Sequence, residues 1–181
     1  MIKKTATVVL GITGSIAAYR ACDIISALRQ EGVQVQAILT KEGQEFITPL
    51  SVQTLSRNKV ITDMFDLPEK WDPVHTSIAD KADLILIAPA TANVIGKLAG
   101  GICDDLLTCV VFATEAPVLI APAMNDKMYR NRIVQDNIAK LKKAGYKFVG
   151  PIKGHLACGH VDMGHIAETS QIVGEAKRLL K

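Results

Sequence analysis

The residues with the clearest chemical meaning form the turn GITGS at positions 11–15, directly after an apolar run. Thr13 and Ser15 offer hydroxyl groups beside the backbone N–H groups of a predicted helix N-terminus, which together suit a terminal phosphate. A dinucleotide site has the spacing GxGxxG and an acidic residue after the second strand, but here the turn is GxxGS and the second strand ends in LTK. The turn therefore favours a mononucleotide such as FMN over NAD. The structural alternative is a tight turn at Gly14 with a hydroxyl that caps the helix.

Two further segments place polar side chains after apolar runs. APATANV at 88–94 presents Thr91 and Asn93, and APAMNDKMY at 121–129 presents Asn125. Each begins with Ala-Pro-Ala, and because proline has no backbone N–H we expect it to end the strand. An amide both donates and accepts, as recognition of a flavin edge or a carboxylate requires. Each turn alone has a structural explanation, but three polar turns on one sheet edge favour a ligand site.

A glycine-rich segment, GHLACGHVDMGHIAE at 154–168, holds Cys158 and three histidines. We interpret residues 151–168 as a loop that forms a flap over a substrate and excludes water. The spacing HxxCxH, with another histidine five residues later, fits no common structural zinc site, so we expect no metal. Cys22, Cys103 and Cys109 lie in apolar, predicted helical surroundings and are interpreted as core residues. The four cysteines form no CxxC pair, which favours a reducing cytoplasm.

These residues need a sheet to position them, and the hydrophobic pattern predicts one. Apolar runs predict strands at 5–12, 33–39, 82–88, 117–121 and 146–150. Amphipathic segments predict helices at 15–32, 48–57, 91–101, 103–116, 131–145 and 168–181, while 58–77 is interpreted as a long connection. The pattern predicts a doubly wound α/β fold, a parallel sheet of five to six strands covered on both faces. Ligands of such sheets bind at the carboxyl ends of the strands, where the polar turns lie.

Composition excludes several classes of protein. The 181 residues, 49% apolar and 22% charged, suit one globular domain over residues 1–181. The net charge of +3 is small and the lysines and arginines are scattered, so the sequence does not indicate a groove that binds nucleic acid. The longest apolar stretches are far shorter than the roughly 20 residues that span a bilayer. MIKK leads directly into the first strand, so no signal peptide is expected, and neither a membrane nor a nucleic acid is an expected partner.

The segments GITGSIAAYR, PATANV, PAMNDKM and GHLACG, together with the histidine in WDPVHTSIAD, resemble the family of homo-oligomeric flavin-containing cysteine decarboxylases. The resemblance runs from about residue 5 to 170 in the order of that family. It implies a flavodoxin-like, three-layer sandwich that binds FMN near subunit interfaces and assembles as a homotrimer or as four trimers in a dodecamer. The sequence departs from the family at Val94, Tyr129, Asp162 and His165, and the last two bear on flap geometry and substrate preference.

The resemblance also implies roles for individual residues. His75 and Cys158 match the catalytic positions, with Cys158 as the proton donor in the final reduction. Asn125 matches the residue that holds the substrate carboxylate, and His155, Leu156 and Ala157 of the flap match substrate-binding positions. The implied FMN-binding residues come from the polar turns and the end of the second strand: Thr13, Gly14, Ser15, Ile16, Thr40, Thr91, Ala92, Asn93, Val94 and Ala123.

The implied reaction removes carbon dioxide from phosphopantothenoylcysteine in coenzyme A biosynthesis. FMN oxidises the CH2–SH carbon to a thioaldehyde, carbon dioxide leaves, and the enethiol is reduced to phosphopantetheine. The enzymatic alternative is a peptide that ends in cysteine, as in lantibiotic maturation; flavin prenyltransferases have a different GxSGA turn. The non-enzymatic alternatives are a regulatory FMN-binding protein and an electron carrier. We expect no fused ligase domain in these residues, and the sequence leaves open whether the chain is free-standing or part of a longer fusion.

Overall fold

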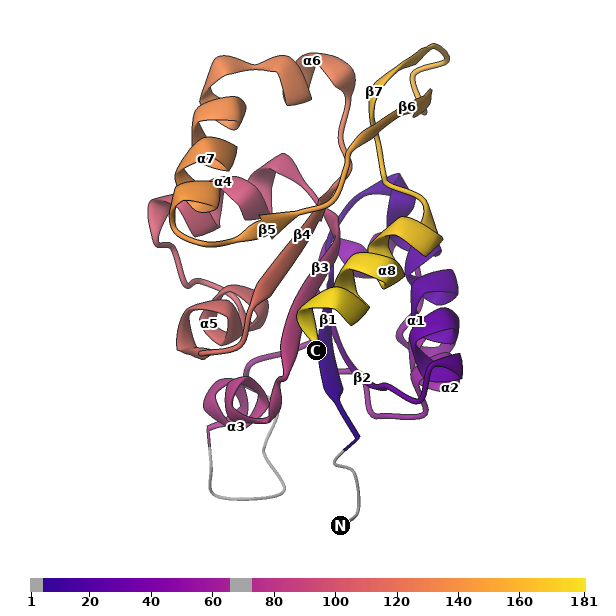
Figure 1. The fold of residues 1–181 in the computed structure, drawn as a ribbon, viewed down its shortest axis with the longest axis vertical. Coiled ribbons are helices and arrows are strands. Elements are labelled where there is room, and N and C mark those ends of the chain that lie inside the picture. Colours follow the sequence, from indigo (N-terminus) through magenta and orange to yellow (C-terminus); the bar gives the residue numbers. More distant parts are fainter. Residues whose placement is uncertain (1–4, 66–72) are drawn as a thin grey trace.

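The computed structural model describes residues 5–65 and 73–181 (Figure 1). Its central sheet has five parallel strands in the order β2-β1-β3-β4-β5. The strands are β1 (Thr7–Ile12), β2 (Gln34–Leu39), β3 (Leu84–Ala90), β4 (Val118–Pro122) and β5 (Lys147–Phe148). Every residue of β3 and β4 is buried, as expected for strands that are covered on both faces. The predicted α/β fold is therefore confirmed, with five strands.

Helices cover both faces of the sheet (Figure 1). One face packs against α1 (Arg20–Gln30), α2 (Pro49–Ser56) and α8 (Thr169–Leu179). The other packs against α3 (Val74–Lys81), α4 (Ala92–Gly100), α5 (Leu106–Ala113) and α7 (Arg132–Lys143). Successive residues of β1 alternate between the two cores, with Val8 and Leu10 in one and Val9 in the other. Among the described helices, none is long and apolar enough to cross a membrane.

Hydroxyl residues determine where two of the predicted helices begin. The helix predicted at 15–32 starts as a short 3-10 helix, η1 (Ile16–Tyr19), because the Ser15 hydroxyl accepts from the Ala17 N–H at 3.3 Å. Thr48 caps α2 in the same way, with Pro49 in the first helical position, where its missing N–H costs nothing. A second 3-10 helix, η2 (Gly43–Glu45), follows β2.

The expectation that Pro89 ends the third strand is wrong. β3 continues through Pro89 to Ala90, which pairs with Pro122 of β4 after a shift in register. A proline removes only one donor from the ladder, and the Ala90 carbonyl still accepts from the Ala123 N–H at 3.0 Å. The Ala-Pro-Ala segments thus form the ends of the strands, and the polar turns start immediately after them.

The helix predicted at 103–116 is shorter than expected. Asp105 is its N-cap, since the carboxylate accepts from the Thr108 N–H at 2.8 Å while the Asp105 N–H donates back to the Thr108 hydroxyl. α5 therefore begins at Leu106, and Cys103 lies outside it and is exposed. The interpretation of Cys103 as a core residue is wrong, whereas Cys22 and Cys109 are half-buried. Burial, followed by the Asp23 carboxylate, raises the pKa of the Cys22 thiol.

The least regular parts of the sequence contain more structure than expected. α3 begins at Val74, inside the predicted 58–77 connection, of which residues 66–72 lie outside the described residues. A five-residue helix, α6 (Asp126–Arg130), follows β4 and has no counterpart in the sequence prediction. The segment 151–168, predicted as a loop, forms an antiparallel hairpin of β6 (Ile152–His155) and β7 (Val161–His165).

We predict that Asp105→Ala lowers the free energy of unfolding at pH 7 by about 1–2 kcal/mol, because it removes a helix cap. Burial raises the pKa of Asp105, but hydrogen bonds from Lys97 and Thr108 outweigh it and leave the pKa below its ordinary value. The carboxylate therefore contributes fully above its unfolded pKa of about 3.9, and its contribution is lost as the pH falls through the lower folded value. Urea unfolding at pH 7 and pH 3 measures this difference. An equal loss at both pH values would contradict the prediction, and Asp105→Asn, which keeps the cap, should lose less.

Candidate functional site

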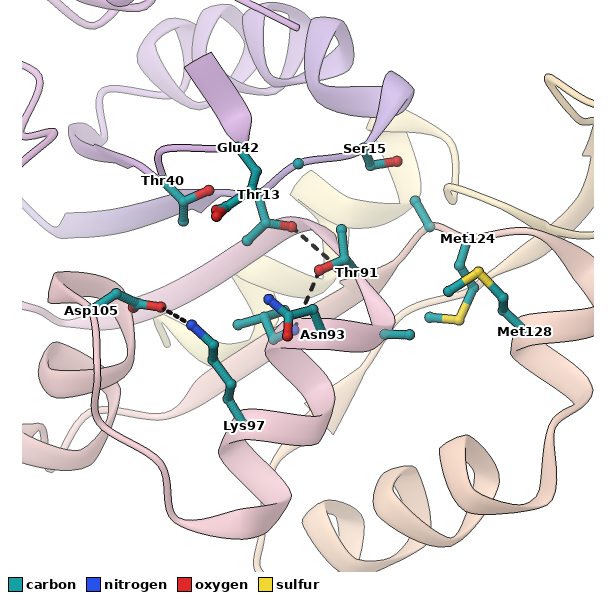
Figure 2. Close-up of a pocket in the computed structure, with 14 residues that line it drawn as sticks. Thr13, Ser15, Thr40, Glu42, Thr91, Asn93, Lys97, Asp105, Met124 and Met128 are labelled. Carbon is teal, nitrogen blue, oxygen red and sulfur yellow. Dashed lines mark hydrogen bonds and ion pairs between the residues drawn. The ribbon is translucent and has the colours of Figure 1, made fainter. Parts of the chain in front are cut away.

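A pocket of about 320 Å³ opens at the carboxyl end of the sheet (Figure 2). Thr13, Thr40, Thr91 and Ala123 line it, and each is the first residue after its strand. The volume lies within the range of small-molecule sites. Nine of the predicted FMN-binding residues line this pocket: Thr13, Gly14, Ser15, Thr40, Thr91, Ala92, Asn93, Val94 and Ala123. Ile16 is not among the lining residues; it is 59% exposed at the start of η1.

Thr13 has a different role from the predicted one. Its hydroxyl donates to the Pro89 carbonyl at 2.7 Å and accepts from the Thr91 N–H at 3.2 Å, so it is not free to donate to a phosphate. The side chain is buried and connects the end of β1 to the end of β3. The Ser15 hydroxyl, in contrast, only accepts from Ala17 in its cap, and its own hydrogen remains a donor.

Gly14 allows two neighbouring turns to pack closely. A Cβ atom at Gly14 would lie 2.4 Å from the Cβ of Glu42, which follows β2. Any side chain at position 14 would therefore push these turns apart. Glu42 also lines the pocket and was not predicted, because the sequence gives no sign of this long-range contact.

Four other lining residues were also missed: Lys97, Asp105, Met124 and Met128. Lys97 donates to Asp104 and Asp105, each at 2.8 Å. Burial lowers the pKa of Lys97, but these two hydrogen bonds outweigh it and raise the pKa overall, so the ammonium stays charged. Met124 and Met128 lie on the opposite side of the pocket in Figure 2 and give it an apolar wall. Two methionines four residues apart beside Asn125 were the available sequence signal.

Asn125 stands beside the pocket with its amide held in one orientation. It caps α6, where its Oδ1 accepts from the N–H groups of Lys127 at 2.9 Å and Met128 at 3.4 Å. Its Nδ2 therefore faces outward and donates to the Cys158 sulfur at 3.5 Å. Asn125 and Cys158 are not themselves lining residues, but Met124, which directly precedes Asn125, and Met128 do line the pocket.

The hairpin places Cys158 beside Asn125 because β7 docks on the segment between β4 and α6. The Met124 N–H donates to the Gly164 carbonyl at 3.0 Å, and a Cβ at Gly164 would lie 2.2 Å from the Met124 carbonyl oxygen. Arg130 of α6 pairs with Asp162 of β7. A hydrogen bond from the Met163 N–H and the charge of Arg130 lower the pKa of Asp162. Asp162, one departure from the family pattern, thus helps to hold the hairpin.

Cys158 lies in the turn between β6 and β7, next to two side chains that complete a chain of contacts. The His160 Nε2 lies 3.0 Å from the Asp126 carboxylate, and the Cys158 sulfur lies 3.6 Å from His160 Nδ1. Asp126, on α6, is only 4% exposed. Sequence reasoning considered His160 only as a possible zinc ligand and did not connect it with Asp126. The predicted substrate-binding residues, His155, Leu156 and Ala157, immediately precede Cys158 but do not line the pocket.

His75 is not brought together with the other predicted site residues. It lies in the first turn of α3 and is half-buried. Figure 1 shows α3 at the end of the molecule opposite the hairpin, near the start of β3. His75 is also absent from the pocket lining. Within one chain, His75 and Cys158 therefore belong to different regions.

The parallel sheet and the pocket at its carboxyl end define an α/β protein of the doubly wound type, and comparison with known families identifies its class. The family model described as Flavoprotein matches residues 2–181, so the chain belongs to the Flavoprotein family.

Individual relatives are also similar over most of the chain. The chain is 41% identical to a probable phosphopantothenoylcysteine decarboxylase of Streptococcus mutans, across 97% of this chain and 99% of that protein. It is 48% identical to the coenzyme A biosynthesis bifunctional protein CoaBC of Bacillus subtilis, across 94% of this chain but 42% of the relative. The chain thus spans less than half the length of the bifunctional relatives that it matches.

Two solved structures share the fold. A PPC decarboxylase mutant complexed with pantothenoylaminoethenethiol has a TM-score of 0.85 and 32% identity, over 97% of this chain and 98% of the other. The FMN binding protein AtHal3 has a TM-score of 0.83 and 32% identity, over 97% of this chain and 96% of the other. These similarities confirm the predicted flavodoxin-like class of fold.

We predict that Gly164→Ala releases the hairpin from the segment before α6. The added methyl group collides with the Met124 carbonyl, and the φ of +136° at this position disfavours any side chain. Overpacking of this kind costs about 1–3 kcal/mol, so hydrogen exchange at the Met124 amide should accelerate about tenfold or more. Gly174→Ala is the matched control, since its Cβ meets nothing within 4 Å in α8. Unchanged Met124 exchange in the Gly164 variant would contradict the docking described above.

Proposed function

We propose that the protein is an FMN-dependent decarboxylase that converts phosphopantothenoylcysteine to phosphopantetheine in coenzyme A biosynthesis. The observation that carries the proposal is the 3.5 Å contact between Asn125 Nδ2 and the Cys158 sulfur, next to the pocket-lining residue Met124. A substrate that ends in cysteine requires a hydrogen-bond donor for its carboxylate next to a group that can donate a proton. The similarity to a probable phosphopantothenoylcysteine decarboxylase over nearly its whole length supports this substrate.

The residues of the pocket fit FMN. The Ser15 hydroxyl and the first N–H groups of η1 form a donor set for the ribityl phosphate. Ala92, Val94 and Met124 offer apolar surface for the ring system, and the exposed Asn93 amide offers polar contacts for its edge. When bound, FMN supplies a reversible acceptor for the hydride of the substrate carbon that carries sulfur.

Asn125 and Cys158 have separate roles in the proposed reaction: one binds the carboxylate and the other donates a proton. The outward Nδ2 of Asn125 donates to the substrate carboxylate, and because the amide carries no charge it does not stabilise the carboxylate strongly against loss of carbon dioxide. Cys158 gives its proton to the enethiol as the product becomes saturated. The hairpin carries the exposed Cys158 in its turn, and in the proposed reaction it would cover the bound substrate.

We further propose that His75 acts from a neighbouring subunit, in a homotrimer or a tetramer of trimers. This proposal is supported by the position of α3 at the end of the molecule opposite the hairpin (Figure 1) and by the absence of His75 from the pocket lining of its own chain. Exposed apolar side chains at Ile16, Tyr19 and Leu50 offer surface that an assembly would bury. There, His75 serves as an acid or base in the early steps. The free cysteines suit a cytoplasmic enzyme.

The first functional test offers FMN and phosphopantothenoylcysteine to the protein. We expect a yellow protein that forms saturated phosphopantetheine, detected by mass spectrometry. Cys158→Ser should keep its FMN and still release carbon dioxide, but accumulate the unsaturated enethiol because the proton donor is lost. Cys103→Ser, which changes an exposed cysteine outside the pocket lining, is the control and should match the parent. If the protein is yellow but leaves the substrate intact, the result favours a binding protein or an electron carrier. If it decarboxylates only a peptide that ends in cysteine, the result favours the lantibiotic-type reaction.

The second test asks whether His75 acts across subunits. His75→Asn alone should block the early steps, with neither carbon dioxide nor enethiol formed. When His75→Asn and Cys158→Ser chains are dissociated and reassembled together, some sites combine an intact His75 with an intact Cys158 from different chains. We expect saturated product to reappear in the mixture only. A mixture as inactive as its two components would contradict the proposed arrangement.

A further inference from the structure

The Asp126–His160–Cys158 chain is the polar cluster that the proposed reaction does not yet use. It joins two elements, α6 and the hairpin, through the 3.0 Å contact of His160 with Asp126 and the 3.6 Å contact with Cys158. The Asp126 side chain is 6% exposed and the His160 side chain 48% exposed. A buried carboxylate needs a hydrogen-bonded or charged partner, and His160 provides it. The cluster thus runs from the interior to the surface.

The contact with Asp126 determines how the His160 ring can act. A carboxylate accepts only, so the ring donates its Nε2–H to Asp126. The other nitrogen, Nδ1, is then the one closer to the Cys158 sulfur, at 3.6 Å compared with 3.9 Å for Nε2. The sulfur thus lies beside the ring, at similar distances from both nitrogens, and a second proton on Nδ1 places the positive charge of the ring next to it, while Asp126 balances that charge. This is the arrangement in which a third group orients a histidine beside a thiol.

We propose that His160, oriented by Asp126, stabilises the Cys158 thiolate and returns a proton to it in each catalytic cycle. The inference rests on the proposed function for the step at which the proton is used. His160 and Asp126 are positioning residues, because they act through Cys158 and not on the substrate.

The step balances as follows. The Cys158 S–H bond breaks, its electron pair stays on sulfur, and the proton forms a C–H bond at one carbon of the enethiol; FMN, when bound, would supply the hydride for the second C–H bond. The protonated His160 ring, which turns its Nδ1–H toward the neighbouring thiolate, gives that proton to the sulfur. The neutral ring then takes a proton from water at its exposed side.

The other charged groups near His160 do not replace Asp126. Asp162 of β7 interacts with His160 electrostatically, but it pairs with Arg130 and accepts from the Met163 N–H. The negative charge aimed at the ring is that of Asp126, with the Asn125 amide on the other side of the thiol. Asp126→Asn should therefore weaken the effect of His160, while the separate Asp162→Asn change should weaken it less.

The test measures the alkylation of Cys158 by iodoacetamide at pH 7 with peptide mass spectrometry, in the FMN-loaded protein without substrate. A thiolate reacts and a thiol does not. An interaction with a charged group can change the population of the thiolate about tenfold. We therefore expect His160→Gln to slow the alkylation of Cys158 about tenfold. Exposed Cys103 in the same sample is the internal reference and should react at an unchanged rate. His165→Gln is the matched control in β7, because its ring bonds the Ile166 carbonyl and not the cysteine.

Turnover provides the second measurement. His160→Gln should still release carbon dioxide but shift the products toward the enethiol about tenfold, and added imidazole should restore saturated product in His160→Ala. Unchanged alkylation in His160→Gln would overturn the inference, as would an equal loss in His165→Gln. Faster alkylation of the parent after a chelator would also overturn it, since a bound cation would then occupy the three side chains. If the parent does not decarboxylate the substrate, the proposed function fails, while the alkylation result still decides the His160–Cys158 pair.

Discussion

The buried hydroxyl of Thr13 is the interaction on which the pocket depends. It donates to the carbonyl of Pro89 and accepts from the N–H of Thr91, so one side chain joins the ends of β1 and β3. Thr91 in turn caps α4 by accepting from Val94. A buried hydroxyl that both donates and accepts a hydrogen bond makes its surroundings more rigid. A buried hydroxyl without a partner would lower the stability of the fold by about 1–3 kcal/mol. The positions of the turns that line the pocket therefore follow from a residue that does not itself face the ligand as a donor.

The sheet could be predicted from the sequence because its signal is local. Apolar runs such as 84–90 are nearly unbroken, and only a strand covered on both faces explains them. The position of Thr91 followed from the rule that ligands bind at the carboxyl ends of parallel strands, whereas Thr40 and Ala123 were implied by the family resemblance. Hydrophobic periodicity failed to predict where a helix begins when a capping side chain determines that position. Asp105, for example, caps α5 and leaves Cys103 outside the helix.

The parts that could not be predicted depend on contacts between distant residues. Glu42 enters the pocket because Gly14, 28 positions earlier, leaves room for it. His160 meets Asp126 only because β7 docks on Met124 through Gly164. The glycine, the aspartate and the histidine were each visible in the sequence, but no spacing rule connects them. The sequence predicts a loop in place of the hairpin for a different, local reason: the alternation of apolar and polar residues over 152–165 is too weak to indicate strands.

The fixed amide of Asn125 has a consequence for what leaves the site. Its oxygen is committed to the start of α6, so the face that it turns toward Cys158 can only donate. A group that only donates hydrogen bonds attracts an anion such as a carboxylate, and it forms no hydrogen bond with a carbon atom that no longer carries a carboxylate. In the proposed reaction, departure of carbon dioxide removes the group that the amide would hold, so the same cap that stabilises a short helix would favour release of the decarboxylated product over release of the substrate.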